Sequence, residues 1–365
     1  MRVNARLVQG GVALDVDGRT VLWEGASEGA LGDMAVCTAV LPAMTGGGSR
    51  LQFSERVSPE LLRNSATLQE VFGAWLPDAR PVDIDAPPCS VQRAGPRETV
   101  CFFSGGVDSF HAVVTFRNEI DRLVFVEGFD IQRDQSLLLR KVRSSLEAAA
   151  DQLGLPLTVL RTDVRDWSDE LVGWPMYHGA ALATAAHLLA GTAWRAFVPS
   201  SYAYGELFPW GSHPLTDPLW SGSVKVEHRG AGADRVQKVA ALVDEEAAWR
   251  NLRVCWRNPN QTYNCGECEK CLRTMTTLEA YGALTRFEAF PDTLSASRVA
   301  ALRLRGESSQ RFAQANVRLL AERSIRPDLE RAWQRALAGP SLRQRVRFRT
   351  RQTAGSMLRQ LRLRG

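Results

Sequence analysis

The 365-residue sequence has no apolar run near the roughly 20 residues that are needed to cross a lipid bilayer. Its first residues alternate between apolar and polar side chains, so they lack the apolar centre of a secretory signal peptide. Seven cysteines are too few for a disulfide scaffold in a chain of this length, and no internal repeat is visible. These absences predict a cytoplasmic protein with no membrane partner.

Two common nucleotide-binding loops are also missing. The sequence contains no G-x-x-x-x-G-K-[ST], and no G-x-G-x-x-G follows a predicted strand. Their absence disfavours kinase-like chemistry at the γ-phosphate of ATP. The remaining composition, 45% hydrophobic and 23% charged, is that of an ordinary globular protein. The length allows two domains, or one large domain with extensions.

Regular alternation of strands and helices begins near residue 98. Short, largely apolar strands are predicted at 99–103, 123–126, 157–160, 196–198 and 252–255, and helices at 107–118, 135–153, 177–189 and 235–249. This pattern predicts an α/β fold whose parallel sheet has helices on both faces. Ligands of such sheets bind at the carboxyl ends of the strands. The loops expected to meet there follow Phe103, Gly128, Asp163 and Ser201.

The two flanks of this region have other patterns. The first 95 residues predict a β-rich module with strands at 12–16 and 20–23, no long helix before one at 58–75, and a proline-rich linker at 77–96. After Phe290, helices are predicted at 295–305, 309–323 and 328–338. We therefore predict an N-terminal module (1–95), a central domain (96–290) and a helical, basic C-terminal region (291–365).

The net charge of +5 is concentrated at the C-terminal end. Residues 341–365 contain eight arginines and no acidic residue. This segment is either a solvated tail or a surface for nucleic acid, an acidic protein partner or a phosphate-rich ligand.

A tight glycine turn follows the first central strand, in the sequence Ser104-Gly105-Gly106-Val107-Asp108-Ser109. A strand, a glycine turn and a helix together form a concavity of backbone N–H groups at the positive end of the helix, which attracts phosphate. The hydroxyls of Ser104 and Ser109 add donors. Asp108 is a poor phosphate contact, so we expect it to hold Mg²⁺. The alternative is a plain strand-to-helix turn.

Four of the cysteines are clustered as C-x9-C-x2-C-x2-C, at Cys255, Cys265, Cys268 and Cys271. Four thiolates are the ligand set of tetrahedral structural zinc. An iron–sulfur cluster uses the same ligands and is the alternative. Four protein ligands leave no open position at a zinc ion, so the predicted metal role is structural.

The glycine turn resembles the signature of the PP-loop ATP pyrophosphatases. Together with the cysteine pattern, it resembles the 7-cyano-7-deazaguanine synthases (QueC-like proteins) over roughly residues 98–282. The resemblance implies an enzyme that cleaves ATP to AMP and pyrophosphate and adenylates a carboxylate of a 7-deazaguanine-type substrate. The acyl group would then pass to nitrogen. Ammonia would give an amide and then a nitrile, whereas an amine of a protein partner would give an amide conjugate.

The resemblance also implies particular site residues. An adenine pocket is expected around Gly128 and Phe129, and a basic residue on a later helix is expected to contact phosphate. Lys238 is the best match, with Arg235 one turn earlier, and Asp108 and Lys238 would be the catalytic pair. Without the resemblance, Arg235 and Lys238 are simply an i, i+3 pair on one helix face.

The chain departs from the synthases where their acceptor pocket is expected, in the segments 129–132, 175–179 and 211–218. It therefore resembles a diverged member, and diverged members occur in bacterial defence operons. Substrate contacts are predicted for His178, Ser201, His213 and Asp217. As alternatives, His178 is a hydrogen-bonded core residue, and His213 and Asp217 belong to turns.

Two other functions stay open at this point. One is modification of a tRNA nucleobase through adenylation, with the arginine-rich tail on RNA phosphates. The other is a catalytically silent nucleotide-binding module, stabilised by zinc, that serves an assembly.

Overall fold

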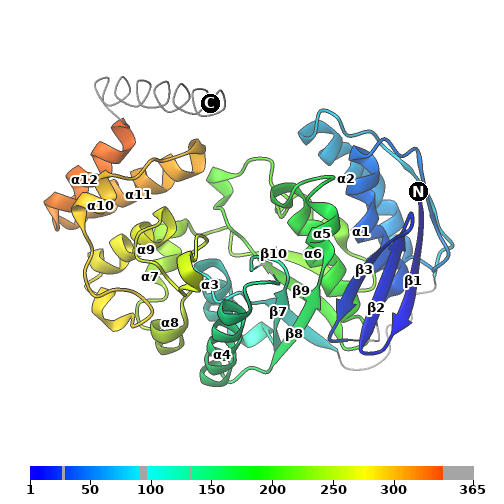
Figure 1. Ribbon diagram of the computed structural model, residues 1–365, viewed down its shortest axis with the longest axis horizontal. Helices are drawn as coiled ribbons and strands as arrows, with labels where there is room; N and C mark the ends of the chain where they lie inside the picture. Colours follow the sequence, from blue (N-terminus) through cyan, green and yellow to red (C-terminus); the bar gives the residue numbers. More distant parts are fainter. Residues whose placement is uncertain (27–28, 90–96, 132, 340–365) are drawn as a thin grey trace, which may run out of the picture. The chain divides into compact units, whose positions relative to one another are not determined.

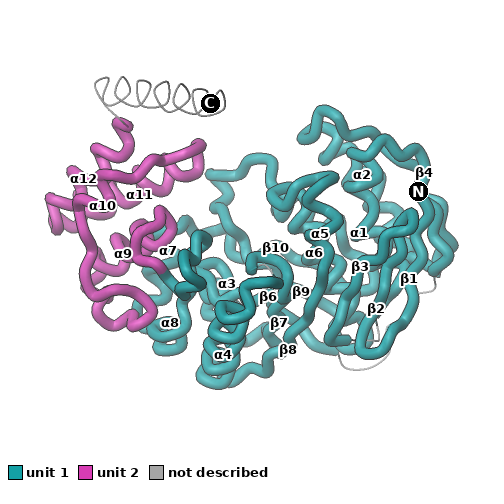
Figure 2. Tube along the Cα trace, viewed as in Figure 1, with its two compact units in different colours: residues 1–264 teal, residues 265–365 magenta. Residues whose placement is uncertain are grey.

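The computed structural model describes residues 1–26, 29–89, 97–131 and 133–339. The chain forms two compact units, unit 1 (Met1–Asn264) and unit 2 (Cys265–Gly365), which Figure 2 distinguishes by colour. The arginine-rich segment at 341–365 lies outside the described residues. Within the described part of the chain, no helix has the length and apolar character needed to span a membrane.

Unit 1 is built on a ten-stranded sheet with the strand order β10-β9-β6-β7-β8-β3-β2-β1-β4-β5. Neighbours from β10 to β8 are all parallel, so the predicted α/β fold with a mainly parallel sheet is confirmed. The prediction located four of these five strands, and the bounds are β6 Glu98–Phe102, β7 Arg122–Glu127, β8 Leu157–Thr162, β9 Ala193–Pro199 and β10 Lys225–Arg229.

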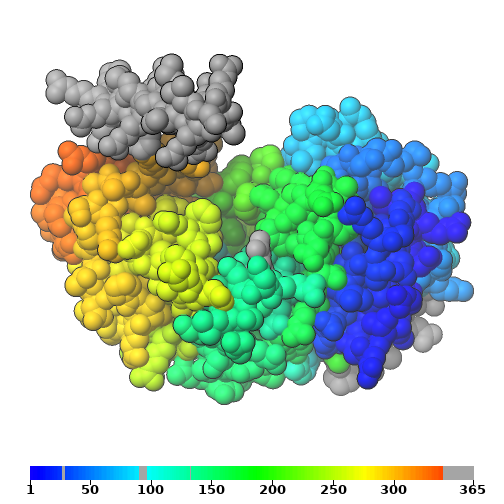
Figure 3. Space-filling view, viewed as in Figure 1, coloured from blue at the N-terminus to red at the C-terminus, as the bar shows by residue number. Residues whose placement is uncertain are grey.

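The N-terminal strands continue the same sheet. The antiparallel strands β1 (Arg2–Val8), β2 (Gly11–Val16) and β3 (Arg19–Glu24) lie side by side next to β8 in Figure 1. The junction is an antiparallel pairing in which Trp23 lies opposite Thr162. In Figure 3 the blue N-terminal atoms lie directly against green atoms of the same unit. Residues 1–24 therefore share a sheet with the region that holds the glycine loop.

The predicted linker at 77–96 is partly a strand. Residues of β5 (Asp83–Asp85) pair in parallel with β4 (Arg50–Phe53), which in turn pairs with β1. A short edge strand with acidic ends is hard to recognise from sequence, because only Ile84 of its three residues is apolar.

The expectation of no long helix before residue 58 was wrong. Helix α1 (Leu31–Thr45) is buried at every position from 32 to 44. It packs against α6 (Trp174–Leu188) and against the N-terminal strands. A helix that is apolar on all sides has no amphipathic period, and this is the signal on which the prediction depended. The following helix, α2 (Pro59–Trp75), lies where it was predicted.

The remaining helices of unit 1 connect and cover the parallel strands. Predicted helices near 107–118, 135–153 and 177–189 are confirmed with shifted bounds, whereas the single helix expected at 235–249 is broken after Ala240. The bounds are α3 Val107–Phe116, α4 Ser136–Leu153, α5 Val164–Ser168, α7 Arg235–Ala240 and α8 Glu246–Asn251.

The prediction of a strand at 252–255 was also wrong, since this segment is not part of the sheet. The strand that pairs with β9 at the edge of the sheet is β10. The backbone N–H groups of Val254 and Cys255 donate to the side-chain oxygen of Asn264, and the N–H of Arg253 donates to the carbonyl oxygen of Gly105. A loop and a side chain thus accept the hydrogen bonds that a neighbouring strand would otherwise accept.

Unit 2 is helical in its described part. The helices predicted after Phe290 are present with shifted bounds, preceded by one that was not predicted. Trp333 is fully buried and its Nε1 donates to the hydroxyl of Thr276 at 3.0 Å, which ties the last helix to the first. The bounds are α9 Glu269–Ala280, α10 Ala296–Ala300, α11 Gly306–Arg323 and α12 Pro327–Ala338.

Candidate functional site

The glycine turn lies between β6 and α3, as predicted. Gly105 has φ +71°, a conformation that side chains rarely adopt, and a Cβ added there would lie 2.9 Å from Cδ2 of Leu146. Gly106 is the N-cap of α3, and its carbonyl oxygen accepts the hydroxyl of Ser109 at 3.0 Å. The turn therefore presents the amino end of α3 at the carboxyl edge of the parallel strands, where an anion is favoured.

Asp108, in the first turn of α3, pairs with two cations from α7. Its Oδ2 lies 2.9 Å from Arg235 and its Oδ1 lies 3.3 Å from Nζ of Lys238. Burial alone would raise the pKa of Asp108, but these two cations hold that pKa below its usual value. Because both carboxylate oxygens face cations, this geometry does not support the predicted Mg²⁺ ligation by Asp108.

Lys238 is almost completely buried, with 1% of its side chain exposed. Its Nζ donates to the carbonyl oxygen of Ser200 at 2.6 Å, at the end of β9, in addition to its contact with Asp108. Burial lowers the pKa of Lys238, and Asp108 offsets part of that effect. The tertiary structure thus brings three predicted residues, Asp108, Arg235 and Lys238, to one place beside the glycine turn.

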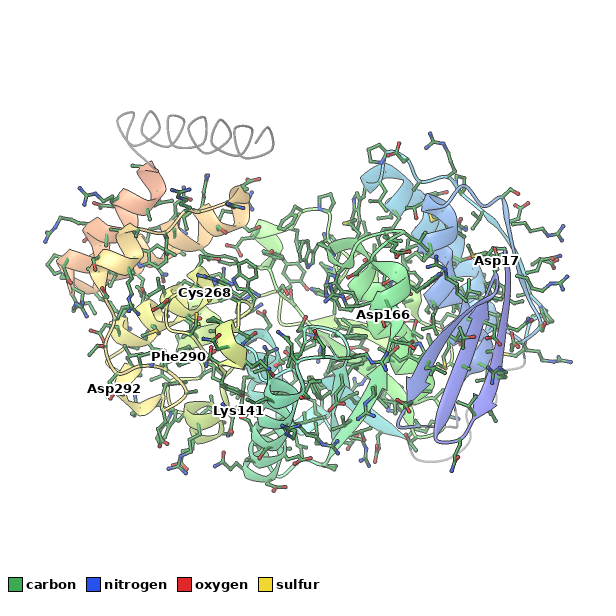
Figure 4. All side chains as sticks on the ribbon, viewed as in Figure 1. Asp17, Lys141, Asp166, Cys268, Phe290 and Asp292 are labelled. Atoms are coloured by element: carbon green, nitrogen blue, oxygen red, sulfur yellow. The ribbon has the colours of Figure 1, made fainter. Side chains whose placement is uncertain are left out.

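The loops after β7 and β8 enclose a cavity of about 370 Å³. Gly128, where an adenine pocket is expected, lines it together with Thr162, and a Cβ on Gly128 would lie 2.1 Å from the carbonyl oxygen of Thr162. The other lining residues are charged: Arg133, Asp134, Asp163, Arg165, Asp166 (labelled in Figure 4) and Asp169. Acidic side chains repel phosphate, so only the uncharged part of a nucleotide would suit this cavity.

Phe129 lies beside this cavity and belongs to the core. Its side chain is buried, with ring centroids 6.1 Å from Trp23 and 5.0 Å from Trp174. Its carbonyl oxygen accepts a hydrogen bond from Arg165 at 2.7 Å. Phe129 therefore supports the wall of the cavity.

Two of the predicted substrate contacts already have hydrogen-bond partners within the chain. The Nε2 of His178 accepts the backbone N–H of Ser212, and its Nδ1 lies 3.2 Å from the carbonyl oxygen of Trp174. The Nδ1 of His213 accepts the N–H of Leu215 at 3.0 Å. Burial lowers the pKa of both imidazoles, so both are neutral at physiological pH. A substrate would have to replace these bonds or use the remaining ring surface.

Asp217 is buried and faces a residue that the sequence did not single out. The carboxylate accepts the hydroxyl of Ser212 at 2.7 Å and the N–H of His213 at 3.2 Å, and it lies 2.7 Å from Nδ1 of His228. His228 is in β10, the strand that the prediction missed. The sequence signal available was a histidine at a strand end before Gly230, which by itself is weak.

The four clustered cysteines meet in space. Their sulfur atoms lie within 4.8 Å of one another, and Cys265 and Cys271 are 3.9 Å apart. A tetrahedral ion with Zn–S bonds of about 2.3 Å needs sulfur atoms about 3.8 Å apart. Backbone N–H groups of Asn258 and Cys268 donate to sulfur atoms of Cys255 and Cys265, as thiolates require. The donor set therefore fits a zinc ion, as predicted.

Local backbone geometry supports this arrangement. Gly266, between two of the cysteines, has φ +66°, and a Cβ there would lie 2.7 Å from Pro291. Cys268, labelled in Figure 4, is the N-cap of α9, and Cys271 is in the first turn of that helix. A tight turn followed by a helix start is a common way to direct two thiolates toward one point.

No protein-family model matches this chain, and neither a curated protein nor a solved structure matches it.

The site is therefore defined by geometry alone. The tertiary structure brings together Asp108, Arg235 and Lys238, with Ser201 close by through its carbonyl oxygen, 3.5 Å from Arg235. It separately brings together the four cysteines. His178 and Asp217 are linked through Ser212, which bonds to both.

Proposed function

We propose that this chain is an ATP-dependent enzyme of the PP-loop type, which adenylates a carboxylate and transfers the acyl group to nitrogen. The observation that carries this proposal is the convergence of Arg235 and Lys238 on the amino end of the helix after the glycine turn. Backbone N–H groups, a helix amino end and two cations form a suitable site for pyrophosphate.

The charges of the site suggest how ATP would react there. Lys238 and Arg235 would stabilise the negative charge that grows on pyrophosphate as it leaves the α-phosphorus. The substrate carboxylate oxygen forms the new bond to that phosphorus, which gives an acyl adenylate and pyrophosphate. A nitrogen nucleophile then attacks the acyl carbon and AMP leaves with the electron pair. Asp108 holds both cations in position before ATP binds.

The substrate is proposed to be a carboxylate on a 7-deazaguanine-type ring, in line with the resemblance given above. The pocket departures at 175–179 and 211–218 fit a changed acceptor, such as an amine of a protein partner in a defence system. The four cysteines would hold structural zinc, which would order the chain beside the glycine turn without taking part in the reaction.

The test is to incubate the protein with ATP, magnesium, 7-carboxy-7-deazaguanine and ammonium, and to resolve the products by mass spectrometry. We expect AMP and pyrophosphate together with an amide or a nitrile. A protein mass shift instead would indicate conjugation to an amine of a protein. Binding of ATP without pyrophosphate release would contradict the proposal and favour a silent nucleotide-binding module.

A charge-removing variant makes the test specific to this site. Lys238→Met should reduce pyrophosphate formation by at least about 100-fold, because an electrostatic contact to the leaving group is lost. Lys141→Met is the matched control, since Lys141 is an exposed residue of α4, labelled in Figure 4. Equal rates in the two variants would contradict a role for Lys238.

A further inference from the structure

Unit 1 contains a second cavity, of about 270 Å³, that the proposed ATP site does not use. Its walls come from α3 (His111 and Thr115), from the end of β10 with the turn that follows (His228 and Gly230) and from Tyr204. The turn is rich in small residues, so the backbone leaves room for a small ligand.

The two histidines that line this cavity each have one ring nitrogen without a hydrogen-bond partner among the described residues, Nδ1 of His111 and Nε2 of His228. Both atoms are buried, and only 3% of the His228 side chain is exposed. A buried nitrogen without a partner is costly, so two such nitrogens on residues that line one cavity favour a small hydrogen-bonding ligand there.

The contact of Nδ1 of His228 determines whether its Nε2 can accept a hydrogen bond. Nδ1 lies 2.7 Å from Asp217, whose carboxylate can only accept a hydrogen bond while it is ionised. With Nδ1 donating to Asp217, Nε2 is the ring nitrogen left for a ligand, and it carries a lone pair whenever the ring holds a single proton. Ser212 donates to the same oxygen of Asp217 and so holds the carboxylate in this orientation. Because Ser212 contacts the aspartate and not the histidine, this is not the arrangement of a serine hydrolase.

The cavity is a neighbour of the proposed phosphate site. His111 is one helical turn beyond Asp108 on α3. Burial lowers the pKa of His111 to about 4, and the charges of Lys238, Asp108 and Arg235 also act on it. A ligand in the cavity thus meets two imidazoles, next to the residues that would hold pyrophosphate.

We propose that this cavity binds the nitrogen nucleophile and that His228 is its general base, with Asp217 as the positioning residue. The inference rests on the proposed function. Ammonium or a protonated amine gives a proton to Nε2 of His228, and the proton then passes to water. The freed nitrogen forms a bond to the acyl carbon, the bond from that carbon to the phosphate oxygen breaks, AMP leaves with the electron pair, and the nitrogen gives its surplus proton to water.

The test measures the two half-reactions separately: adenylation, which releases pyrophosphate, and transfer of the acyl group to nitrogen. In His228→Asn, the amide side chain still offers a donor to Asp217 but no base to the cavity. Pyrophosphate formation with ATP and the carboxylate substrate should stay near the wild-type rate. Ammonia-dependent amide formation should fall by about 100-fold or more, which is the usual contribution of a general base. Hydroxylamine is largely unprotonated at neutral pH, so transfer to hydroxylamine should fall far less.

Two further variants keep the result interpretable. Asp217→Asn removes the charge that fixes the tautomer of His228, and it should produce the same selective loss if His228→Asn does not fold. His187→Asn is the matched control, because His187 is also fully buried with an aspartate, Asp33, 3.7 Å from its Nδ1. That variant should lower both half-reactions together, through the amount of folded protein.

The possible results distinguish failure of this inference from failure of the proposed function. Unchanged ammonia transfer in His228→Asn, or an equal loss in both half-reactions, would overturn this inference alone. Loss of a bound metal ion from His228→Asn with unchanged transfer would also overturn it, since His228 would then be a metal ligand. A wild-type protein that forms no pyrophosphate would overturn the proposed function and this inference with it.

Discussion

The backbone N–H of Arg253 donates to the carbonyl oxygen of Gly105 at 2.8 Å. This bond joins the glycine turn to the segment that ends in Cys255, two residues later. A Cβ added at Gly105 would lie 3.4 Å from the carbonyl oxygen of Asn251, and one added at Gly106 would lie 3.6 Å from that of Arg253. The conformation of the proposed phosphate site therefore depends on the order of the segment that leads to the cysteines.

The first prediction concerns this dependence. Cys255→Ser should lose about one equivalent of zinc and lower the unfolding midpoint by more than about 5 °C, because structural zinc contributes directly to folding free energy. Pyrophosphate formation should fall with it. Cys89→Ser, at a half-buried cysteine outside the cluster, is the control and should keep its zinc. Metal analysis together with thermal unfolding checks this, and strong visible absorption would instead identify an iron–sulfur cluster. A zinc-free variant with an unchanged midpoint would contradict the structural role.

The second prediction separates backbone strain from crowding at the glycine turn. Gly105 and Gly10 have almost the same φ, +71° and +74°, but only a Cβ on Gly105 would have neighbours within 4 Å. Alanine at either position should cost about 1 kcal/mol of unfolding free energy from backbone strain. Gly105→Ala should cost more, through its contact with Leu146, and should also abolish pyrophosphate formation. Equal effects of the two variants on stability and turnover would show that the turn is ordinary.

The third prediction concerns Asp33, a buried aspartate in α1. Its carboxylate accepts the N–H groups of Ser58 and Ser223, each at 2.7 Å, and so links three distant segments of unit 1. Asp33→Ala leaves one buried and one partly buried backbone donor without an acceptor and should lower the unfolding free energy by about 3 kcal/mol. Urea unfolding monitored by circular dichroism measures this. The exposed Asp83→Ala is the control, and a loss below about 0.5 kcal/mol is expected there.

The fourth prediction is a pH dependence from His111. Burial lowers the pKa of His111 from 6.5 to about 4, so the folded protein keeps this ring neutral where the unfolded chain binds a proton. Its contribution to stability is complete above pH 6.5 and is lost as the pH falls from 6.5 toward 4. At about 1.4 kcal/mol per pH unit, the effect is at most about 3 kcal/mol.

The comparison that checks it is urea unfolding of the wild-type protein and His111→Gln at pH 7 and at pH 4.5. The variant should lose less stability between the two values than the wild type does, because glutamine does not titrate. Other histidines contribute equally to both proteins and cancel in the difference. An identical pH dependence in the two proteins would show that His111 is protonated in the folded state.

The local sequence was sufficient for those features that depend on neighbouring residues. The glycine turn at 104–109 follows a short apolar strand and precedes a helix, and both elements form from local pattern. The cysteine spacing predicted a metal site because three of the four ligands lie within seven residues, 265–271, and a short chain can bring them together. Helix α2 was predicted in the same way, from its Pro59 start and amphipathic pattern.

The predictions of other elements failed because those elements depend on residues that are distant in the sequence. Helix α1 is buried on every side and so resembles an apolar run without a period. The segment 252–255 is apolar like a strand, but a loop and an asparagine side chain accept its hydrogen bonds. The strand β10, which does lie in the sheet, has few apolar residues among its five, Lys225–Arg229, because it forms the edge beside β9.

The sequence by itself determined the mainly parallel α/β plan, the glycine turn and the cysteine cluster, since each depends on residues close together in the chain. Only the tertiary structure decided which distant side chains share a site. Asp108 and Lys238 are 130 residues apart, yet they meet because α3 and α7 both begin at the carboxyl edge of the sheet. The Asp217–His228 pair likewise depends on β10 lying beside β9, a pairing between strands that the local pattern did not specify.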